Sequence, residues 1–213
     1  MRTIKWIVLL ALMGSFGCAK KKDVGAPEDE KLALTRLSQP ETTNAQPLTL
    51  SKDGKDWISI EFTGKGLEVR SGNHMLVLAA LRGQCTVNGR MYSVKKKDYG
   101  YKVYDPHDEL LLKFKRYPDK IKIGQSEDDP EAWTLRPKPD DPTSYKVKRG
   151  DTELGKISHY ADQNLVKAKD NENNVLCRVE SSLLLQAPAV AFMDDLSLGK
   201  QLMVCAILTV MEE

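Results

Sequence analysis

Short runs in which hydrophobic and polar residues alternate begin at Trp57 and recur at intervals of about ten residues, with turn-forming residues between them. Trp57–Phe62 is the first of these runs, and a period of two is typical of strands with one buried face. Asn88-Gly89 separates Cys85–Val87 from Met91–Val94 and predicts a type I′ hairpin, because both turn residues tolerate positive φ. Met75–Leu81 fits either a strand or a short helix.

The middle of the chain contains two related segments. Tyr101-Lys102-Val103 recurs as Tyr145-Lys146-Val147, a spacing of 44 residues, and each copy continues through a turn and a Glu-Leu pair to a tyrosine, Tyr117 or Tyr160. The alternation within each copy predicts a β-meander. Repeats of this length also occur in propellers, but the chain holds fewer than the usual four blades. We therefore expect a closed antiparallel barrel.

The last hydrophobic stretch, Leu196–Met211, has a helical and not an alternating pattern. Its second half is apolar on every side except at Thr209, so the helix must be buried in a core or a membrane. It is too short to span a bilayer, which needs about 20 apolar residues. Asp194 and Asp195 precede it and are expected to cap its N-terminus. We predict a mostly β fold, an antiparallel barrel around this C-terminal hydrophobic helix.

The first residues differ from all of these. Arg2 and Lys5 lead into an apolar run, Trp6–Met13, which is followed by small residues up to Gly17 and then by Cys18. This order is typical of a secretory signal peptide. A cysteine after a small residue at this place resembles the lipobox of bacterial lipoproteins. The resemblance implies cleavage between Gly17 and Cys18 and acylation of Cys18 with palmitate-type chains, which would hold the protein at a membrane without spanning it.

The lipobox departs from the family pattern at Ser15, where Leu is usual. Cleavage by an ordinary signal peptidase before Cys18 or Lys20, which would leave a soluble secreted protein, therefore stays open. Ala19 stands where lipoproteins retained in the inner membrane carry Asp. By that resemblance we expect the outer membrane, with the protein facing the periplasm or the cell surface.

These patterns divide the chain into a signal peptide (residues 1–17), a lipidated N-terminus with a flexible tether (residues 18–52) and a β-barrel domain (residues 53–213). The tether has few large apolar side chains and cannot offset the entropy cost of ordering. The chain has 32 basic and 30 acidic residues, and loss of residues 1–17 removes only Arg2 and Lys5 among the charged ones. A neutral mature chain lacks the basic field of nucleic-acid-binding proteins.

The lysine-rich meander carries a second resemblance. Tyr101-Lys102-Val103 with Glu109-Leu110, then Tyr145-Lys146-Val147 with Gly155-Lys156-Ile157, and finally a buried apolar helix, together resemble the tubby C-terminal, LURP-one-related and phospholipid scramblase superfamily over residues 85–212. The resemblance implies a twelve-stranded barrel around a central C-terminal helix. Tubby domains bind phosphoinositide headgroups with basic residues, but none of their binding residues can be placed in this sequence.

Lys95, Lys96 and Lys97 form a local basic patch beside Tyr99 and Tyr101. This patch is a candidate for contact with a phospholipid headgroup. The alternative interpretation is that three lysines protect a strand edge from pairing with another chain.

Residues that could act in catalysis or metal binding are scattered. His74, His107 and His159 lie far apart, and the segment Asp170–Asn174 lacks the order of a calcium loop. Asp105 and Asp108 flank His107, in what we interpret as a solvated turn more than as a weak metal site. We expect no catalytic residues, no metal and no cofactor.

The three remaining cysteines allow two interpretations. Cys85 and Cys177 could form a disulfide in an oxidising compartment, with Cys205 as a buried thiol, or all three could be small core residues.

The sequence thus predicts a non-enzymatic, membrane-anchored lipoprotein of the cell envelope whose barrel binds a lipid or a protein partner. Two alternatives stay open. One is an envelope hydrolase with a site assembled from dispersed residues, and the other is a structural or assembly subunit.

Overall fold

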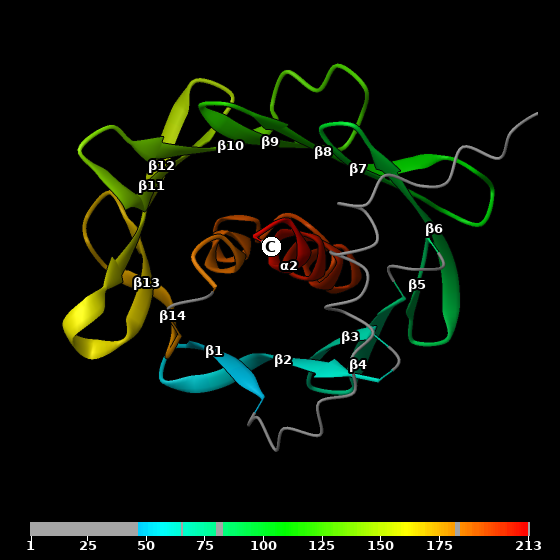
Figure 1. Ribbon diagram of the computed structural model, residues 1–213, viewed down its shortest axis with the longest axis horizontal. Coiled ribbons are helices and arrows are strands. Elements are labelled where there is room, and N and C mark those ends of the chain that lie inside the picture. Colours follow the sequence, from blue (N-terminus) through cyan, green and yellow to red (C-terminus); the bar gives the residue numbers. More distant parts are fainter. Residues whose placement is uncertain (1–46, 65, 80–82, 182–183, 213) are drawn as a thin grey trace, which may run out of the picture.

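A computed structural model describes residues 47–64, 66–79, 83–181 and 184–212. Within these ranges the chain forms fourteen antiparallel strands that follow one another around a closed barrel in sequence order, with β1 and β14 paired to complete the ring (Figure 1). The strands are β1 Leu48–Lys52, β2 Lys55–Thr63, β3 Gly66–Ser71, β4 His74–Ala79, β5 Gln84–Val87, β6 Arg90–Lys97, β7 Gly100–Tyr104, β8 Leu110–Tyr117, β9 Lys120–Gly124, β10 Trp133–Lys138, β11 Asp141–Arg149, β12 Thr152–Tyr160, β13 Leu165–Asp170 and β14 Val175–Val179.

The barrel interior is filled by two helical segments. A 3₁₀ helix, η3 (Ala187–Phe192), and the α-helix α2 (Leu198–Met211) both lie inside the ring of strands, whereas the short η2 (Ala161–Gln163) connects β12 to β13 (Figure 1). The predicted fold class, a mostly β antiparallel barrel around a hydrophobic C-terminal helix, is therefore confirmed. The described residues contain fourteen strands, two more than the tubby-like resemblance implies.

The core forms where alternating strand positions meet the central helix. Ile58 and Ile60 of β2, and Leu112 and Phe114 of β8, are buried, while their neighbours along each strand face outward. The residues from Leu202 to Leu208 of α2 are buried on every side of the helix. Burial on all sides explains why the second half of the helix has no polar face.

Several local predictions are confirmed. Asn88 and Gly89 take φ values of 50° and 81° in the β5–β6 turn, as a type I′ hairpin requires. The two repeat copies form the meanders β7–β8–β9 and β11–β12–β13. The ambiguous stretch after His74 is a strand, β4, as far as Ala79, and the residues that follow, 80–82, lie outside the described ranges.

Two predictions at the edges of the domain are wrong. Leu48–Lys52 was expected to end the tether, but it forms β1, in which Leu50 is fully buried and pairs with Val179. Asp194 and Asp195 do not cap α2, whose N-cap residue is Ser197.

Both carboxylates before α2 bind the barrel wall instead of the helix. Asp194 forms an ion pair with Lys52 of β1, at 3.0 Å, and Asp195 forms one with Arg149 of β11, at 2.9 Å. Together they fasten the loop before α2 to two separate parts of the barrel. The amide of Gln201, which is buried, donates hydrogen bonds to two carbonyls of the same loop.

The cysteines are buried and unbridged. Cys85, Cys177 and Cys205 are free thiols, so the disulfide that the sequence allowed between Cys85 and Cys177 is absent from the described residues. Burial raises the pKa of Cys85 and of Cys177 to about 12, which leaves both thiols protonated and unreactive at neutral pH. All three act as small core residues.

Because neighbouring strands are antiparallel, consecutive turns alternate between the two ends of the barrel. We call the end where β1 begins the Leu48 end. It also holds the β6–β7 turn and the C-terminus of α2. The opposite end, which we call the acidic end, holds the loops β7–β8, β9–β10 and β13–β14. These loops and the segment before α2 carry many carboxylates: Asp105, Asp108, Glu109, Glu127, Asp128, Asp129, Glu131, Glu172, Asp194 and Asp195.

Candidate functional site

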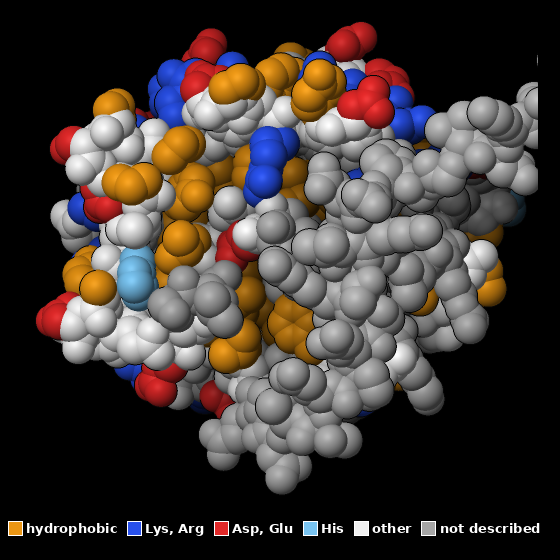
Figure 2. Space-filling model, viewed as in Figure 1, with side chains coloured by type: hydrophobic (Ala, Val, Ile, Leu, Met, Phe, Trp, Pro, Cys, Tyr) orange, Lys and Arg blue, Asp and Glu red, His pale blue; other side chains and the backbone are white. Residues whose placement is uncertain are grey.

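Lysines occupy outward-facing positions on β7, β8, β9, β11, β12 and β13, and Arg178 does so on β14. On β8, Leu112 and Phe114 are buried while Lys113 and Lys115 face outward, and on β13 the buried Val166 alternates with Lys167. Side chains along a strand alternate between the two faces with a period of two, and here lysine repeatedly occupies the outward-facing positions. We call this surface the lysine wall; its residues are Lys102, Lys113, Lys115, Lys122, Lys146, Lys156, Lys167, Lys169 and Arg178. Charged side chains gather along the upper outline of the barrel, over β8 to β10, in Figure 2.

The strand register places these positive charges directly opposite one another. Lys115 pairs with Lys122 across β8 and β9, and Lys156 of β12 stands between Lys146 of β11 and Lys169 of β13. Like charges in opposed positions destabilise a sheet unless something neutralises them. The wall therefore favours any anion that can lie across these strands.

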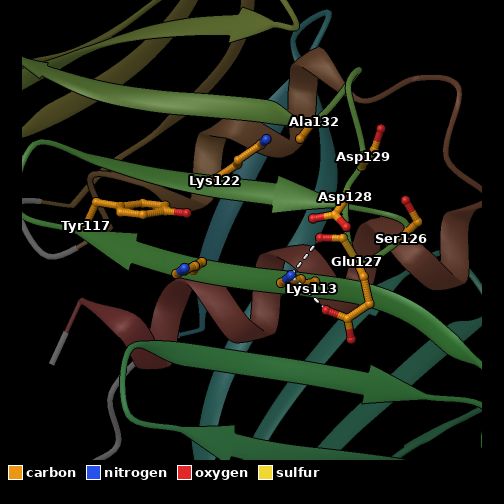
Figure 3. A pocket seen from close by; sticks show the side chains of 10 residues that line it. Lys113, Tyr117, Lys122, Ser126, Glu127, Asp128, Asp129 and Ala132 are labelled. Carbon is orange, nitrogen blue, oxygen red and sulfur yellow. Dashed lines mark hydrogen bonds and ion pairs between the residues drawn. The ribbon is translucent and has the colours of Figure 1, made fainter.

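A small open pocket of about 140 Å³ lies on this wall, over β8 and β9 (Figure 3). Tyr117 lies at one end of the pocket and Glu127, from the β9–β10 loop, at the other, with Lys113 and Lys122 between them. The loop keeps its shape because Asp129 accepts backbone hydrogen bonds from Gln125 at 2.7 Å and from Glu131 at 2.9 Å.

One carboxylate of the pocket, Glu127, is already paired with lysines. Glu127 accepts hydrogen bonds from Lys102 and, at 2.8 Å, from Lys113. These two hydrogen bonds lower the pKa of Glu127 to about 2, so the carboxylate is charged throughout the physiological range. Lys102 and Lys113 therefore have an internal counter-ion.

The Tyr117 end of the pocket has positive charge without a counter-ion. The ammonium group of Lys115 lies 4.8 Å from the centre of the Tyr117 ring, and that of Lys120 lies 5.3 Å from the same ring. Within the described part of the chain, neither of these lysines nor Lys122 forms an ion pair with a carboxylate. We call Lys115, Tyr117, Lys120 and Lys122 the Tyr117 cluster.

The second repeat copy builds a similar group around Tyr160. Lys167 and Lys169 place their ammonium groups 4.7 Å and 5.3 Å from the centre of the Tyr160 ring, and Lys156 lies opposite Lys169. A hydrogen bond from Lys169, together with the charges of all three lysines, lowers the pKa of Tyr160. Across the described ranges these lysines also lack an ion pair. We call Lys156, Tyr160, Lys167 and Lys169 the Tyr160 cluster.

The lysines singled out from the sequence lie elsewhere on the barrel. Lys95, Lys96 and Lys97 are exposed at the end of β6, close to the Leu48 end. Lys95 is engaged with its neighbours, since its ammonium group lies 3.1 Å from Asp108 and 4.2 Å from the centre of the Tyr104 ring. Among the described residues this part of β6 pairs with β7 alone, so the edge-protection interpretation stays open beside headgroup contact.

Gly17 and Cys18, where cleavage and lipidation are predicted, lie outside the described residues. No helix in the described ranges is long and apolar enough to cross a membrane.

The other candidates from the sequence are turns held by local hydrogen bonds. Asp105 accepts backbone hydrogen bonds from His107 at 2.8 Å and Glu109 at 2.9 Å, and Asp170 does the same for Glu172 and Asn174. In the part of the chain that the structure describes, no three His, Cys, Asp or Glu side chains are grouped to hold a metal ion. The two tyrosine clusters were missed, although their lysines alternate visibly with apolar residues in the sequence.

Comparison with known proteins identifies no relative of this chain. No family model matches the chain, and searches of curated proteins and of solved structures find no significant match.

Proposed function

We propose that the chain is a non-enzymatic lipoprotein of the cell envelope, anchored through acylated Cys18 to the outer membrane, on its periplasmic or surface face. The signal-peptide pattern and the lipobox-like Cys18 support the anchor. The barrel acts by binding, with its Leu48 end toward the bilayer and Lys96 and Lys97 on anionic phospholipid headgroups, while Lys95 of the same patch stays paired with Asp108. The resemblance to the tubby-like superfamily supports a lipid as the ligand.

The observation that carries this orientation is the shared position of two features at one end of the barrel. The chain that leads from Cys18 enters the barrel at Leu48, and the β6–β7 turn lies at the same end. Lys96 and Lys97 are exposed there, beside Tyr99, which is 70% exposed. An exposed tyrosine with adjacent lysines suits a membrane interface, where the ring lies at headgroup level and each lysine gains about 1 kcal/mol from anionic lipid.

The opposite end of the barrel supports the same orientation. Its loops carry clustered carboxylates, among them Glu127, Asp128 and Asp129. An anionic membrane surface repels such loops. The acidic end therefore faces away from the bilayer.

Acylation is tested by growing the expressing bacterium with radiolabelled palmitate and comparing the wild type with Cys18→Ala. We expect label on the wild type and none on the variant. Absence of label from the wild type would overturn the anchor.

Orientation is tested separately with tryptophan probes placed at exposed apolar residues on the two ends. Tyr99→Trp lies at the Leu48 end, and Val175→Trp, where Val175 is 46% exposed, lies at the acidic end. The acylated variants are mixed with phosphatidylcholine vesicles that contain a minority of phosphatidylglycerol and a lipid brominated near its headgroup. We expect quenching above the level of the native tryptophans in Tyr99→Trp only.

Equal quenching of the two probes would contradict the end-on orientation. Stronger quenching of Val175→Trp would show the reverse orientation. The contribution of the lysines is measured by adding Lys96→Gln and Lys97→Gln to the Tyr99→Trp chain. This change is expected to reduce quenching in anionic vesicles and to leave it unchanged in neutral ones.

A further inference from the structure

We propose that the lysine wall binds a flexible, phosphate-bearing glycan or polyol polymer, which it holds at the Tyr117 cluster and the Tyr160 cluster together. The envelope as the source of this polymer rests on the proposed function, whereas the binding itself does not. The two clusters lie on corresponding hairpins of the two repeat copies, β8–β9 and β12–β13, so the chain presents two groups of lysines that each surround a tyrosine.

Each cluster has the chemistry of a phosphate site. A lysine ammonium is a compact charge with three hydrogen-bond donors, and two of them at opposed strand positions can share one phosphate group. Lys115 and Lys122 are opposed in this way in the first cluster, as are Lys156 and Lys169 in the second. The tyrosine ring in each cluster holds two ammonium groups over its faces without neutralising them.

The absence of counter-ions separates these clusters from the other lysines of the wall. Lys102 and Lys113 share Glu127, and Lys146 lies 3.6 Å from Glu153. The clusters keep opposed positive charges that destabilise the sheet, so a bound polyanion would stabilise the barrel as well as be held by it.

The curvature of the wall favours a flexible polymer over a flat membrane as the ligand that contacts both clusters. The Tyr117 cluster lies on β8 and β9 and the Tyr160 cluster on β12 and β13, four strands further around the fourteen-stranded ring (Figure 1). Four of fourteen strand steps correspond to roughly 100° around the barrel. A flat bilayer cannot touch both clusters of a convex wall at once, but a flexible chain can bend around it.

Basic residues also lie on the strands between the two clusters. Arg136 of β10 is opposed to Lys146 of β11, and each is paired with an exposed carboxylate, Asp119 or Glu153. Exposed ion pairs contribute little to stability, so phosphates of a passing chain can exchange with these carboxylates. A polymer that leaves one cluster therefore meets positive charge along the way to the other.

The experiment measures binding of the mature acylated protein, in neutral detergent micelles, to fluorescently labelled long-chain inorganic polyphosphate and to tripolyphosphate. Simultaneous contact with two clusters predicts an affinity for the long chain at least about 100-fold above that for tripolyphosphate. It also predicts an affinity that falls steeply with added salt. Equal affinity for the two probes would overturn the proposal, because it would mean that the clusters act independently.

Two double variants locate the contact. Lys115→Gln with Lys122→Gln removes the first cluster, and Lys167→Gln with Lys169→Gln removes the second. Each is expected to lower the affinity for the long chain by about tenfold or more, with a change of less than about threefold for tripolyphosphate, which still has the other cluster. These residues are on the outer wall and their removal relieves repulsion between opposed charges, so we expect thermal unfolding midpoints that are unchanged or slightly higher.

The matched control removes the same charge from the opposite side of the barrel. Lys55→Gln with Arg70→Gln changes β2 and β3 and is expected to lower the long-chain affinity by less than about threefold. A loss as large as that of the cluster variants would show attraction by net charge alone and overturn the proposal. Vesicles rich in phosphatidylglycerol that displace polyphosphate from the wild type, while cluster variants lose vesicle binding in parallel, would assign the clusters to a membrane instead.

These outcomes are independent of the lipid anchor. Loss of palmitate labelling or of vesicle orientation would remove the proposed function and leave polymer binding intact. Failure of the polyphosphate experiment would leave the anchor intact.

Discussion

Glu212 lies just beyond the end of α2, in a partly buried position at the Leu48 end of the barrel. Its carboxylate accepts a backbone hydrogen bond from Leu185 at 3.0 Å and another from Gln186. The positive charge of Arg116, which donates to the carbonyl of Met211, also favours the charged carboxylate. Burial outweighs these contacts and raises the pKa of Glu212 from 4.5 to about 7.

This raised pKa predicts a pH dependence of stability. Between pH 4.5 and pH 7 the folded state binds the Glu212 proton and the unfolded state does not, so the stabilisation is complete below pH 4.5 and is lost as the pH rises to about 7. The loss amounts to at most about 3 kcal/mol. Urea unfolding at several pH values measures the free energy of unfolding in the wild type and in Glu212→Gln.

The difference between the two proteins isolates Glu212 from other carboxylates. The pKa values of Glu127 and Asp105 are lowered by hydrogen bonds. The stabilisation that these two carboxylates contribute to the folded state is therefore lost in the opposite direction, as the pH falls. We expect the wild type to lose stability relative to Glu212→Gln from pH 4.5 to pH 7. A constant difference across that interval would contradict the raised pKa.

At the residue scale, features set by neighbours in sequence could be predicted and those set by distant partners could not. Asn88-Gly89 forms its turn from its own φ preferences. Asp194 and Asp195 also look like local helix caps, but Lys52 and Arg149 bind them across the barrel. Nothing in the sequence around position 194 reveals those partners.

At the scale of elements, α2 shows why a helix can be hydrophobic on every side. Its middle residues, Val204, Cys205 and Ala206, are at most 1% exposed because η3 and the inner faces of the strands surround it. The one interrupting hydroxyl, Thr209, donates a hydrogen bond to the Cys205 carbonyl at 2.9 Å. The Thr209 hydroxyl therefore needs no hydrogen-bond partner from the barrel.

Ala206→Glu should prevent folding. An unpaired carboxylate at this position is buried without a partner, which costs several kcal/mol out of a typical total stability of about 5–15 kcal/mol. The matched control is Ala161→Glu, which places the same side chain on an exposed alanine of η2 and is expected to change stability by less than about 0.5 kcal/mol. Circular dichroism with thermal unfolding makes the comparison, and a soluble, cooperatively unfolding Ala206→Glu protein would contradict the burial of α2.

Only one property of the lysine wall could be predicted from the sequence. The period of two in segments such as Leu110–Tyr117 indicates that lysines face outward. It does not give the register between strands, and only the register shows that Lys115 stands opposite Lys122. The pocket and the tyrosine clusters depend on that register, which explains why they could not be placed beforehand.

At the scale of the whole molecule, the barrel depends on a strand supplied by the segment expected to be a tether. Leu48–Lys52 is short and follows a polar stretch, so its own pattern resembles the end of a linker. In the structure it pairs with both β2 and β14 and closes the ring. Without it two strand edges and the side chains beneath Leu50 would be open to water.

Two truncated chains test where the folded domain begins. A chain that starts at Pro47 keeps β1 and is expected to unfold cooperatively in urea, at the same midpoint as a chain that starts at Cys18. A chain that starts at Asp53 lacks β1 and exposes Ile58 and Val179, which are buried beside Leu50. We expect this shorter chain to aggregate or to unfold without a cooperative transition, because the barrel loses a ladder of backbone hydrogen bonds on both sides of the gap.

Tryptophan fluorescence, to which Trp57 and Trp133 contribute, and size-exclusion chromatography report the two outcomes, since Trp133 is fully buried and donates a hydrogen bond to the Phe192 carbonyl at 3.2 Å. Leu50→Ala in the longer chain provides an intermediate case, expected to lower the free energy of unfolding by about 2–5 kcal/mol. A chain from Asp53 that unfolds at the same urea concentration as the chain from Pro47 would show that β1 is dispensable. In that case the interactions between the central helices and the remaining strands, and not closure of the ring, would hold the barrel together.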